Sequence, residues 1–222
     1  MTEQPNYRTI ARDCRGELEV SRSRFLAVLA RVETEDAARA VIAGQRAAYP
    51  EARHHCSAFV LGPDARVQRS NDDGEPSGTA GAPMLAALRG GAGLTDVVAV
   101  VTRWFGGTLL GTGGLARAYA GAVEAAIEGV TPVIRRQRTL LDVPLSHAQA
   151  GKVEAELRTR GIEVLDTDYT GSGVTLHLAV AEPAAADALL AALTGGAARA
   201  HRVGTVWRDT RETSADARAA ED

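Results

Sequence analysis

The chain has 222 residues, of which 45% are hydrophobic and 24% are charged, and its formal net charge is −3, values that describe a globular protein with one large domain or two small ones. Aromatic residues make up only 4%, and residues 1–138 hold 17 Arg/Lys against 15 Asp/Glu, so the composition excludes a strongly basic nucleic-acid binder and argues against a platform that stacks single-stranded nucleic acid. No apolar run reaches the roughly 18 residues of a membrane span, no signal segment begins the chain, and two cysteines are too few for a disulfide framework, so we expect a cytoplasmic protein that makes no membrane contact.

The first half of the chain carries several signals of helix ends and strands. Thr34 precedes Glu35 and Asp36, which favours a helix start, and Pro50 follows the end of that helix. Residues 71–78 contain Asp, Gly and Pro in a run that excludes the interior of a helix or strand. We expect strands at 17–20, 24–32, 55–61 and 97–104, helices at 35–49, 80–88 and 115–128, and a glycine-rich loop at 105–114.

The second half has a more regular pattern. Residues 141–145 and 174–180 alternate between apolar and polar side chains, as half-buried strands do. Ser146 and Gln149 form a capping box, and Gly161 ends the helix that begins there. A second helix begins at Pro183, and further strands are expected at 162–169 and 199–207. The order β-α-β-β-α-β is that of a ferredoxin-like domain.

These elements predict an α+β protein with two domains. Pro132 and the arginines at 135, 136 and 138 interrupt the pattern between the two halves. We place the first domain at 1–134 and the second, ferredoxin-like domain at 138–207. Residues 208–222 are polar and poor in apolar side chains, so we expect them to form a disordered tail.

A cluster of glycines is the first candidate site. Glycines at the start of a helix let the backbone approach a ligand, and the bare N–H groups with the helix dipole favour an anion. Arg103 and Arg117 flank the cluster and could add charge-assisted contacts. A tight turn that packs the helix against the sheet explains the glycines equally well, and neither the Walker nor the dinucleotide-binding pattern fits. The predicted anion-binding residues are Arg103, Gly106, Gly107, Gly111, Gly113, Gly114 and Arg117.

Two further segments could carry chemistry. Asp72, Asp73 and Glu75 could bind Mg²⁺, although Asp-Gly is also an ordinary turn pair and the turn is favoured. His55 and Cys56 invite a zinc or nucleophile interpretation, but adjacent strand residues point to opposite faces, so a packed core cysteine is favoured. We therefore predict no catalytic residue, no metal and no cofactor.

Three long motifs resemble a known family. Residues 72–81 read DDGEPSGTAG, residues 100–107 read VVTRWFGG, and residues 110–119 read LGTGGLARAY. Together with residues 23–25 and 54–56 they resemble the IMPACT family, in particular its bacterial YigZ-type members, over roughly residues 20–207. Ala82 stands where the family often has a basic residue, and Trp104 replaces the usual tyrosine. The family-motif residues singled out here are Asp72, Asp73, Gly74, Glu75, Thr79, His55 and Cys56.

The resemblance to this family implies a fold and contact with the ribosome or structured RNA. The first domain of the family is similar to the α/β domain shared by elongation factor G, certain ribosomal proteins and the RNase P protein. Its second is similar to a ferredoxin-like domain of elongation factor G. Eukaryotic members modulate translation during amino-acid stress through an added RWD domain. Only about 20 residues precede the shared core here, so we do not expect that domain or its role.

Three functions remain open. The first is a non-catalytic, translation-associated regulatory protein that binds RNA or the ribosome through the glycine-rich anion-binding surface. The second is a Mg²⁺-dependent, hydrolase-like enzyme that acts on a phosphorylated small molecule and uses Asp72, Asp73 or Glu75. The third is a scaffold that docks a protein partner through residues 139–222. We favour them in that order.

Overall fold

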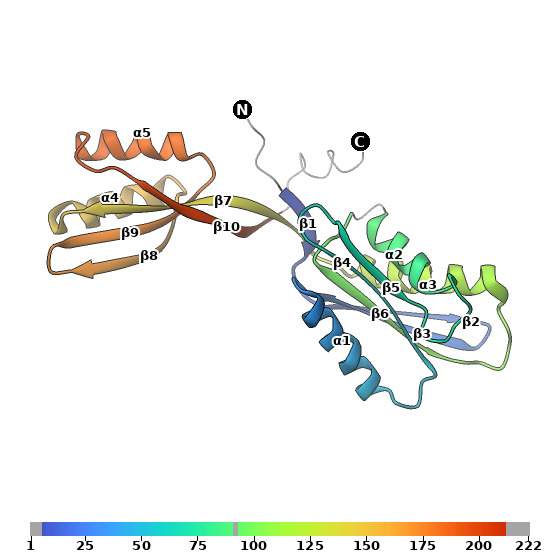
Figure 1. Cartoon of the computed structure of the whole chain (residues 1–222). Helices are drawn as coiled ribbons and strands as arrows, with labels where there is room; N and C mark the ends of the chain where they lie inside the picture. Colours follow the sequence, from blue (N-terminus) through green and yellow to red (C-terminus); the bar gives the residue numbers. More distant parts are fainter. Residues whose placement is uncertain (1–5, 91–92, 212–222) are drawn as a thin grey trace. The chain divides into compact units, whose positions relative to one another are not determined.

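The computed structural model describes residues 6–90 and 93–211, which divide into two compact units (Figure 1). The first unit holds residues 6–135 together with 210–211, and the second holds residues 136–209. Each unit has its own hydrophobic core. No helix among the described residues is long and apolar enough to cross a membrane.

The first unit is built on an antiparallel sheet with the strand order β2-β3-β6-β4-β5. The central strand β6 is buried over almost its whole length, as its continuous apolar run predicts. The strands are β2 (Cys14–Val20), β3 (Ser23–Arg31), β4 (His54–Leu61), β5 (Val67–Asn71) and β6 (Val97–Trp104).

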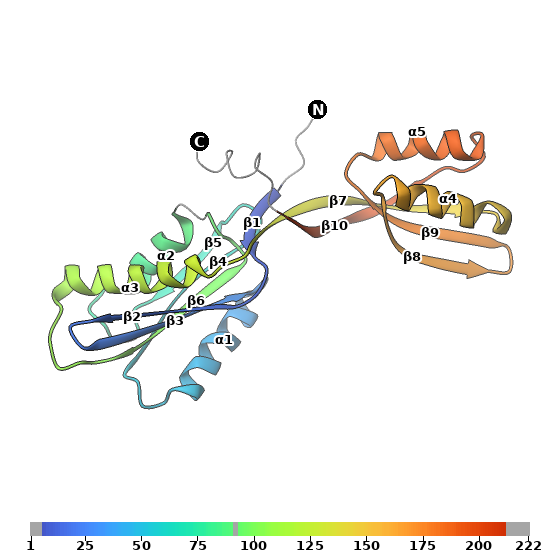
Figure 2. The ribbon, with the colours of Figure 1, turned by 180° about the vertical axis from the view of Figure 1, so that it is seen from behind.

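Helices cover both faces of this sheet, with α1 on one face and α2 and α3 on the other (Figure 1 and Figure 2). Because successive strand residues point to opposite faces, Val98 and Val100 pack toward α1 while Val97, Ala99 and Val101 pack toward α2 and α3. The helices are α1 (Glu35–Ala48), α2 (Gly81–Arg89) and α3 (Gly111–Glu128).

The start of α3 and two strands differ from the sequence-based expectation. Helix α3 begins at Gly111 rather than Leu115, although its four leading residues have low helix propensity and are mostly exposed. Strand β1 (Asn6–Ile10) and strand β5 were not predicted. Strand β5 is mostly exposed at a sheet edge, so its sequence lacks the alternation that marks a half-buried strand.

Strand β7 (Pro132–Leu145) passes through the segment where a domain boundary was expected. Residues 132–135 group with the first unit and the remainder with the second, and β1 is a neighbour of β7 in its sheet. Arg135, which was expected at the domain boundary, lies in a polar network, where its Nη1 is 2.7 Å from Glu33 Oε1 and donates to the Tyr7 hydroxyl at 3.0 Å.

The second unit has the predicted order of elements. Its strands run in the order β10-β7-β9-β8, with antiparallel pairing of β9 to both β7 and β8. Helices α4 and α5 pack on one face of the sheet over a single core (Figure 1). The elements after β7 are α4 (His147–Thr159), β8 (Glu163–Thr170), β9 (Gly173–Val180), α5 (Pro183–Thr194) and β10 (His201–Arg211).

Strand β10 continues past the point where a tail was predicted. Residues 208–211, which were assigned to a disordered segment, form the last part of this strand. The rest of the predicted tail, 212–222, lies outside the described residues.

Candidate functional site

The glycine-rich loop connects β6 to α3 and packs on the turn between β2 and β3. A Cβ atom at Gly106 would lie 2.0 Å from the carbonyl carbon of Arg22, so no side chain fits there. The Gly106 N–H donates to Ser23 Oγ at 3.1 Å. Gly107 and Gly111 have φ values of 86° and 69°, which other residues rarely adopt. The tight-turn interpretation therefore accounts for these three glycines.

Gly113 and Gly114 have a different role, because neither has a positive φ. A Cβ atom at Gly113 would meet only the Arg117 guanidinium, at an ordinary 3.5 Å. The N-cap residue Leu110 supplies no side-chain hydrogen bond to the helix start. The first N–H groups of α3 thus have no capping side chain, and the positive end of the helix dipole is available to an anion.

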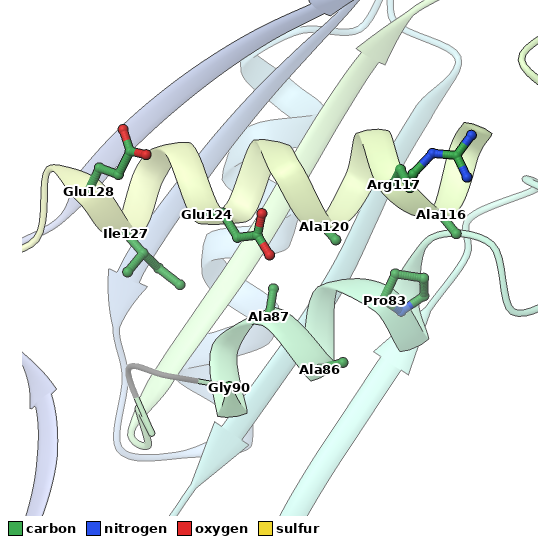
Figure 3. Close-up of a pocket in the computed structure, with 10 residues that line it drawn as sticks. All are labelled: Pro83, Ala86, Ala87, Gly90, Ala116, Arg117, Ala120, Glu124, Ile127 and Glu128. Atoms are coloured by element: carbon green, nitrogen blue, oxygen red, sulfur yellow. The ribbon is translucent and has the colours of Figure 1, made fainter. Parts of the chain in front are cut away.

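Three exposed arginines surround this helix end. Arg22 donates from Nη2 to Thr108 Oγ1 at 3.3 Å. Arg53 lines a cavity together with Gly111 of the first α3 turn. Figure 3 shows Arg117 toward the amino-terminal end of α3, at the opposite end of the α2–α3 groove from Glu128. Their positive charge is local, in a unit whose overall charge is close to neutral.

Arg103 does not lie on this exposed surface, which corrects the sequence-based assignment. It is only 5% exposed, and its Nη1 donates to Glu75 Oε1 in a buried ion pair. Glu75 also accepts a hydrogen bond from the Tyr119 hydroxyl at 2.8 Å. The guanidinium of Arg103 also lies 5.4 Å from the centre of the Phe25 ring and 5.6 Å from the centre of the Phe105 ring. Its charge is therefore balanced within the protein.

A cavity of about 400 Å³ opens beside the amino-terminal end of α3. Its polar wall contains Arg53, His54, Glu75 and Arg103, and Phe105 contributes to the apolar wall. The Nδ1 of His54 is 2.8 Å from the Asp73 carbonyl oxygen, which can only accept a hydrogen bond. In the neutral ring Nδ1 therefore carries the proton, and Nε2 is a hydrogen-bond acceptor located 3.8 Å from Glu75 Oε1.

The acidic segment at 72–75 is used within the fold. The Asp72 carboxylate accepts hydrogen bonds from the N–H groups of Gly78, Ala80 and Gly81, at the start of α2. Burial would raise the pKa of Asp72, but these three hydrogen bonds outweigh it and hold the pKa below its usual value. Asp72 thus caps α2.

The other carboxylates of the segment have separate partners. Asp73 forms an ion pair with Arg46 and accepts from the backbone N–H of His55, whereas Glu75 pairs with Arg103. Within residues 6–90 and 93–211 no group of three or more His, Cys, Asp or Glu side chains could hold a metal ion. Each of the three carboxylates in the segment thus has a partner within the fold.

Turn geometry explains the remaining polar members of the motif. Gly74 has a φ of 84°, a conformation that favours glycine, and Thr79 Oγ1 donates to the Pro76 carbonyl oxygen at 2.6 Å. The segment is thus a turn whose side chains serve α2 and the floor of the cavity.

His55 and Cys56 are buried parts of β4. The His55 Nε2 lies 3.1 Å from the Tyr49 carbonyl oxygen, and burial lowers the pKa of His55. The Cys56 thiol donates to the Asp72 carbonyl oxygen at 3.0 Å, and burial raises the pKa of Cys56 to about 12. A thiol with so high a pKa is a poor nucleophile at neutral pH, which agrees with the packed core cysteine favoured from the sequence.

Several residues of the site were not found from the sequence. Arg22 and Arg53 lie on connections far from the glycine cluster in the chain, and no local pattern relates them to it. His54 and Tyr119 were within quoted motifs but had no assigned role. Leu109 was also missed, although its position gave a signal. A leucine within a glycine-rich loop has no periodic pattern that predicts burial, and its side chain is 88% exposed.

Comparison with known proteins places both units in described families. The Impact N-terminal domain matches residues 21–127, and a domain of unknown function (DUF1949) matches residues 143–197. The chain is 42% identical to the IMPACT family member YigZ of Escherichia coli (strain K12), over 75% of this chain and 81% of that protein. It is 41% identical to the IMPACT family member YvyE of Bacillus subtilis (strain 168), over 74% of this chain and 76% of that protein.

A solved structure resembles the chain over most of its length. This crystal structure of "an hypothetical protein" is 36% identical in sequence, with a TM-score of 0.63, and the match covers 90% of this chain and 98% of that one. The likeness extends over both units.

Proposed function

The chain belongs to the IMPACT family, and on that premise we propose that it is a non-catalytic regulator of translation whose first unit binds structured RNA, on the ribosome or free. The contact is made to phosphate groups. The binding surface consists of the first turn of α3 with Arg22, Arg53 and Arg117, and we call it the α3 phosphate surface.

The observation that carries this proposal is the uncapped start of α3 inside a group of exposed arginines. Arg53 and Arg117 make no ion pair or hydrogen bond with any described residue, so their charges are available to a ligand. Phosphate contacts depend on local rather than net charge, which removes the objection raised by the near-neutral composition. Neither close packing nor a positive φ requires a glycine at position 113. The absence of a side chain there leaves room for a phosphate against the N–H groups of the helix.

The fold of both units also supports the proposal of RNA or ribosome binding. The strand order β10-β7-β9-β8 with both helices on one face is what a ferredoxin-like β-α-β-β-α-β chain produces. We assign the first unit to the α/β domain shared by elongation factor G and the RNase P protein, proteins that contact RNA. A protein partner for residues 139–222 stays a prediction.

Co-sedimentation of the full chain with purified ribosomes over a salt series tests the proposal. The Arg53→Ala/Arg117→Ala variant removes two charges from the α3 phosphate surface, and we expect weaker binding and a salt slope reduced by about 0.7–0.9 per lost contact. Arg89→Ala is the matched control, because Arg89 is an exposed arginine at the carboxyl-terminal end of α2. Absence of binding at low salt, or equal loss in the control, would contradict the proposal.

A further inference from the structure

We propose that the cavity beside α3 takes one unpaired nucleotide, with its base against Phe105 and its phosphate on the first turn of α3. The inference rests on the proposed function and narrows its ligand from any phosphate backbone to an accessible nucleoside phosphate. It assigns a role to a cavity and to two exposed apolar side chains that phosphate binding leaves unused.

The apolar wall of the cavity fits a flat, uncharged ring. Its volume of about 400 Å³ lies within the range of roughly 300–1,000 Å³ that is typical of small-ligand sites. Phe105 is 47% exposed and Leu109 is 88% exposed, and both line the cavity. The Arg103 guanidinium lies 5.6 Å from the centre of the Phe105 ring, a cation–π contact that holds the ring in place. A base can stack on such a positioned ring.

The polar wall supplies a hydrogen-bond acceptor for a base. Arg103 is buried, yet its Nε–H has no hydrogen-bond partner among the described residues, and a buried unsatisfied donor is costly. In the neutral His54 ring, Nε2 is an acceptor on the same wall. A donor on a base edge can pair with His54 Nε2, whereas the Arg103 Nε is enclosed by protein atoms and is not reached from the cavity. A free phosphate leaves the apolar wall unused.

The charges set the direction in which the nucleotide enters. Glu75 and Arg103 form a buried pair whose charges cancel, whereas the start of α3 and the exposed Arg53 attract a phosphate. The base therefore points inward and the phosphate outward. Paired bases in a duplex are stacked and cannot enter, so the ligand is an unpaired nucleotide. The low aromatic content excludes a platform for many bases, but a site for one base needs only one ring.

Fluorescence anisotropy with a short labelled single-stranded RNA and its duplex form tests the inference, and calorimetry with AMP and with inorganic phosphate tests the cavity by itself. We expect tighter binding of the single strand than of the duplex, and of AMP than of phosphate. Phe105→Ala should lower single-strand affinity about 5- to 150-fold and leave duplex affinity and the salt slope unchanged. Tyr169→Ala, which removes a 70% exposed aromatic ring in the second unit, is the matched control.

The outcomes separate this inference from the proposed function. Equal affinity for single strand and duplex, or no effect of Phe105→Ala beyond that of Tyr169→Ala, overturns the inference while salt-dependent RNA binding still stands. Binding of AMP that depends on Phe105, without binding of either RNA, supports the cavity assignment and refutes the proposed function. Binding of neither AMP nor RNA overturns both.

Discussion

Substitution of Arg103 by alanine should destabilise the first unit strongly. The side chains of Arg103 and Glu75 are 6% and 4% exposed, and each is the partner of the other's charge. After the substitution the Glu75 carboxylate stays buried, with the Tyr119 hydroxyl as a remaining donor. One neutral hydrogen bond does not compensate a buried charge, so the folded state loses stability.

The size of this loss follows from the burial of the pair. Removal of one partner of a buried ion pair costs about 3–5 kcal/mol, whereas an exposed pair contributes about 0–1 kcal/mol. Because a domain of this size has a free energy of unfolding of about 5–15 kcal/mol, the loss is a large fraction of the total. The Arg103→Met/Glu75→Gln variant should recover most of it, because both charges are removed and the glutamine oxygen can still accept from Tyr119.

Urea unfolding followed by tryptophan fluorescence measures this difference for the first unit alone. Trp104 lies in the first unit and Trp207 in the second, so a Trp207→Phe background leaves one reporter. Arg117→Ala is the control and should change stability by no more than about 0.5 kcal/mol. A loss below about 1 kcal/mol for Arg103→Ala, or no recovery in the double variant, would refute the buried-pair argument.

Three other consequences can be measured directly. Gly106→Ala should lower the melting temperature of the first unit markedly, because its methyl group would overlap the backbone of the β2–β3 turn; an unchanged melting temperature would show that the loop can move away. Hydrogen bonds to Asp168 and Asp142 raise the pKa of His177, so the protonated imidazole stabilises the folded second unit. This stabilisation is complete below the unfolded histidine pKa of about 6.5 and is lost as pH rises through the folded pKa. Thermal unfolding over a pH series should show that loss in the wild type and not in His177→Gln, and identical profiles would contradict it. The Cys56 thiol should react with a thiol reagent far more slowly in the folded protein than in urea, because burial raises its pKa to about 12; equal rates would contradict this.

The elements with a strong local pattern could be predicted, and those without one could not. Residues 174–180 alternate cleanly and form β9, and the apolar run at 97–104 forms the buried strand β6. Strand β5 and the first turn of α3 were missed, because edge exposure and four glycine or threonine residues remove the periodicity on which such predictions rest.

The candidate site shows the same division. The glycine cluster could be located from the sequence, but three of its five glycines lie in the first turn of α3 rather than in a loop. The partner of Arg103 could not, because Glu75 is 28 residues away and the pairing of strands and helices decides which side chains meet. Arg53 likewise comes to the α3 phosphate surface only through the sheet, in which its neighbour His54 pairs with Arg103 across β4 and β6.

The amino-acid sequence by itself determined the two halves of the protein, the order of elements in the second unit, the glycine-rich connection and membership of the family, because these depend on local periodicity and on long contiguous motifs. Only the tertiary structure decided which charges are available. Arg103 is buried and paired with Glu75, whereas Arg53 and Arg117 are exposed and form no ion pair with a described residue. The chain contains all three as the same residue type, and solvent access alone distinguishes them.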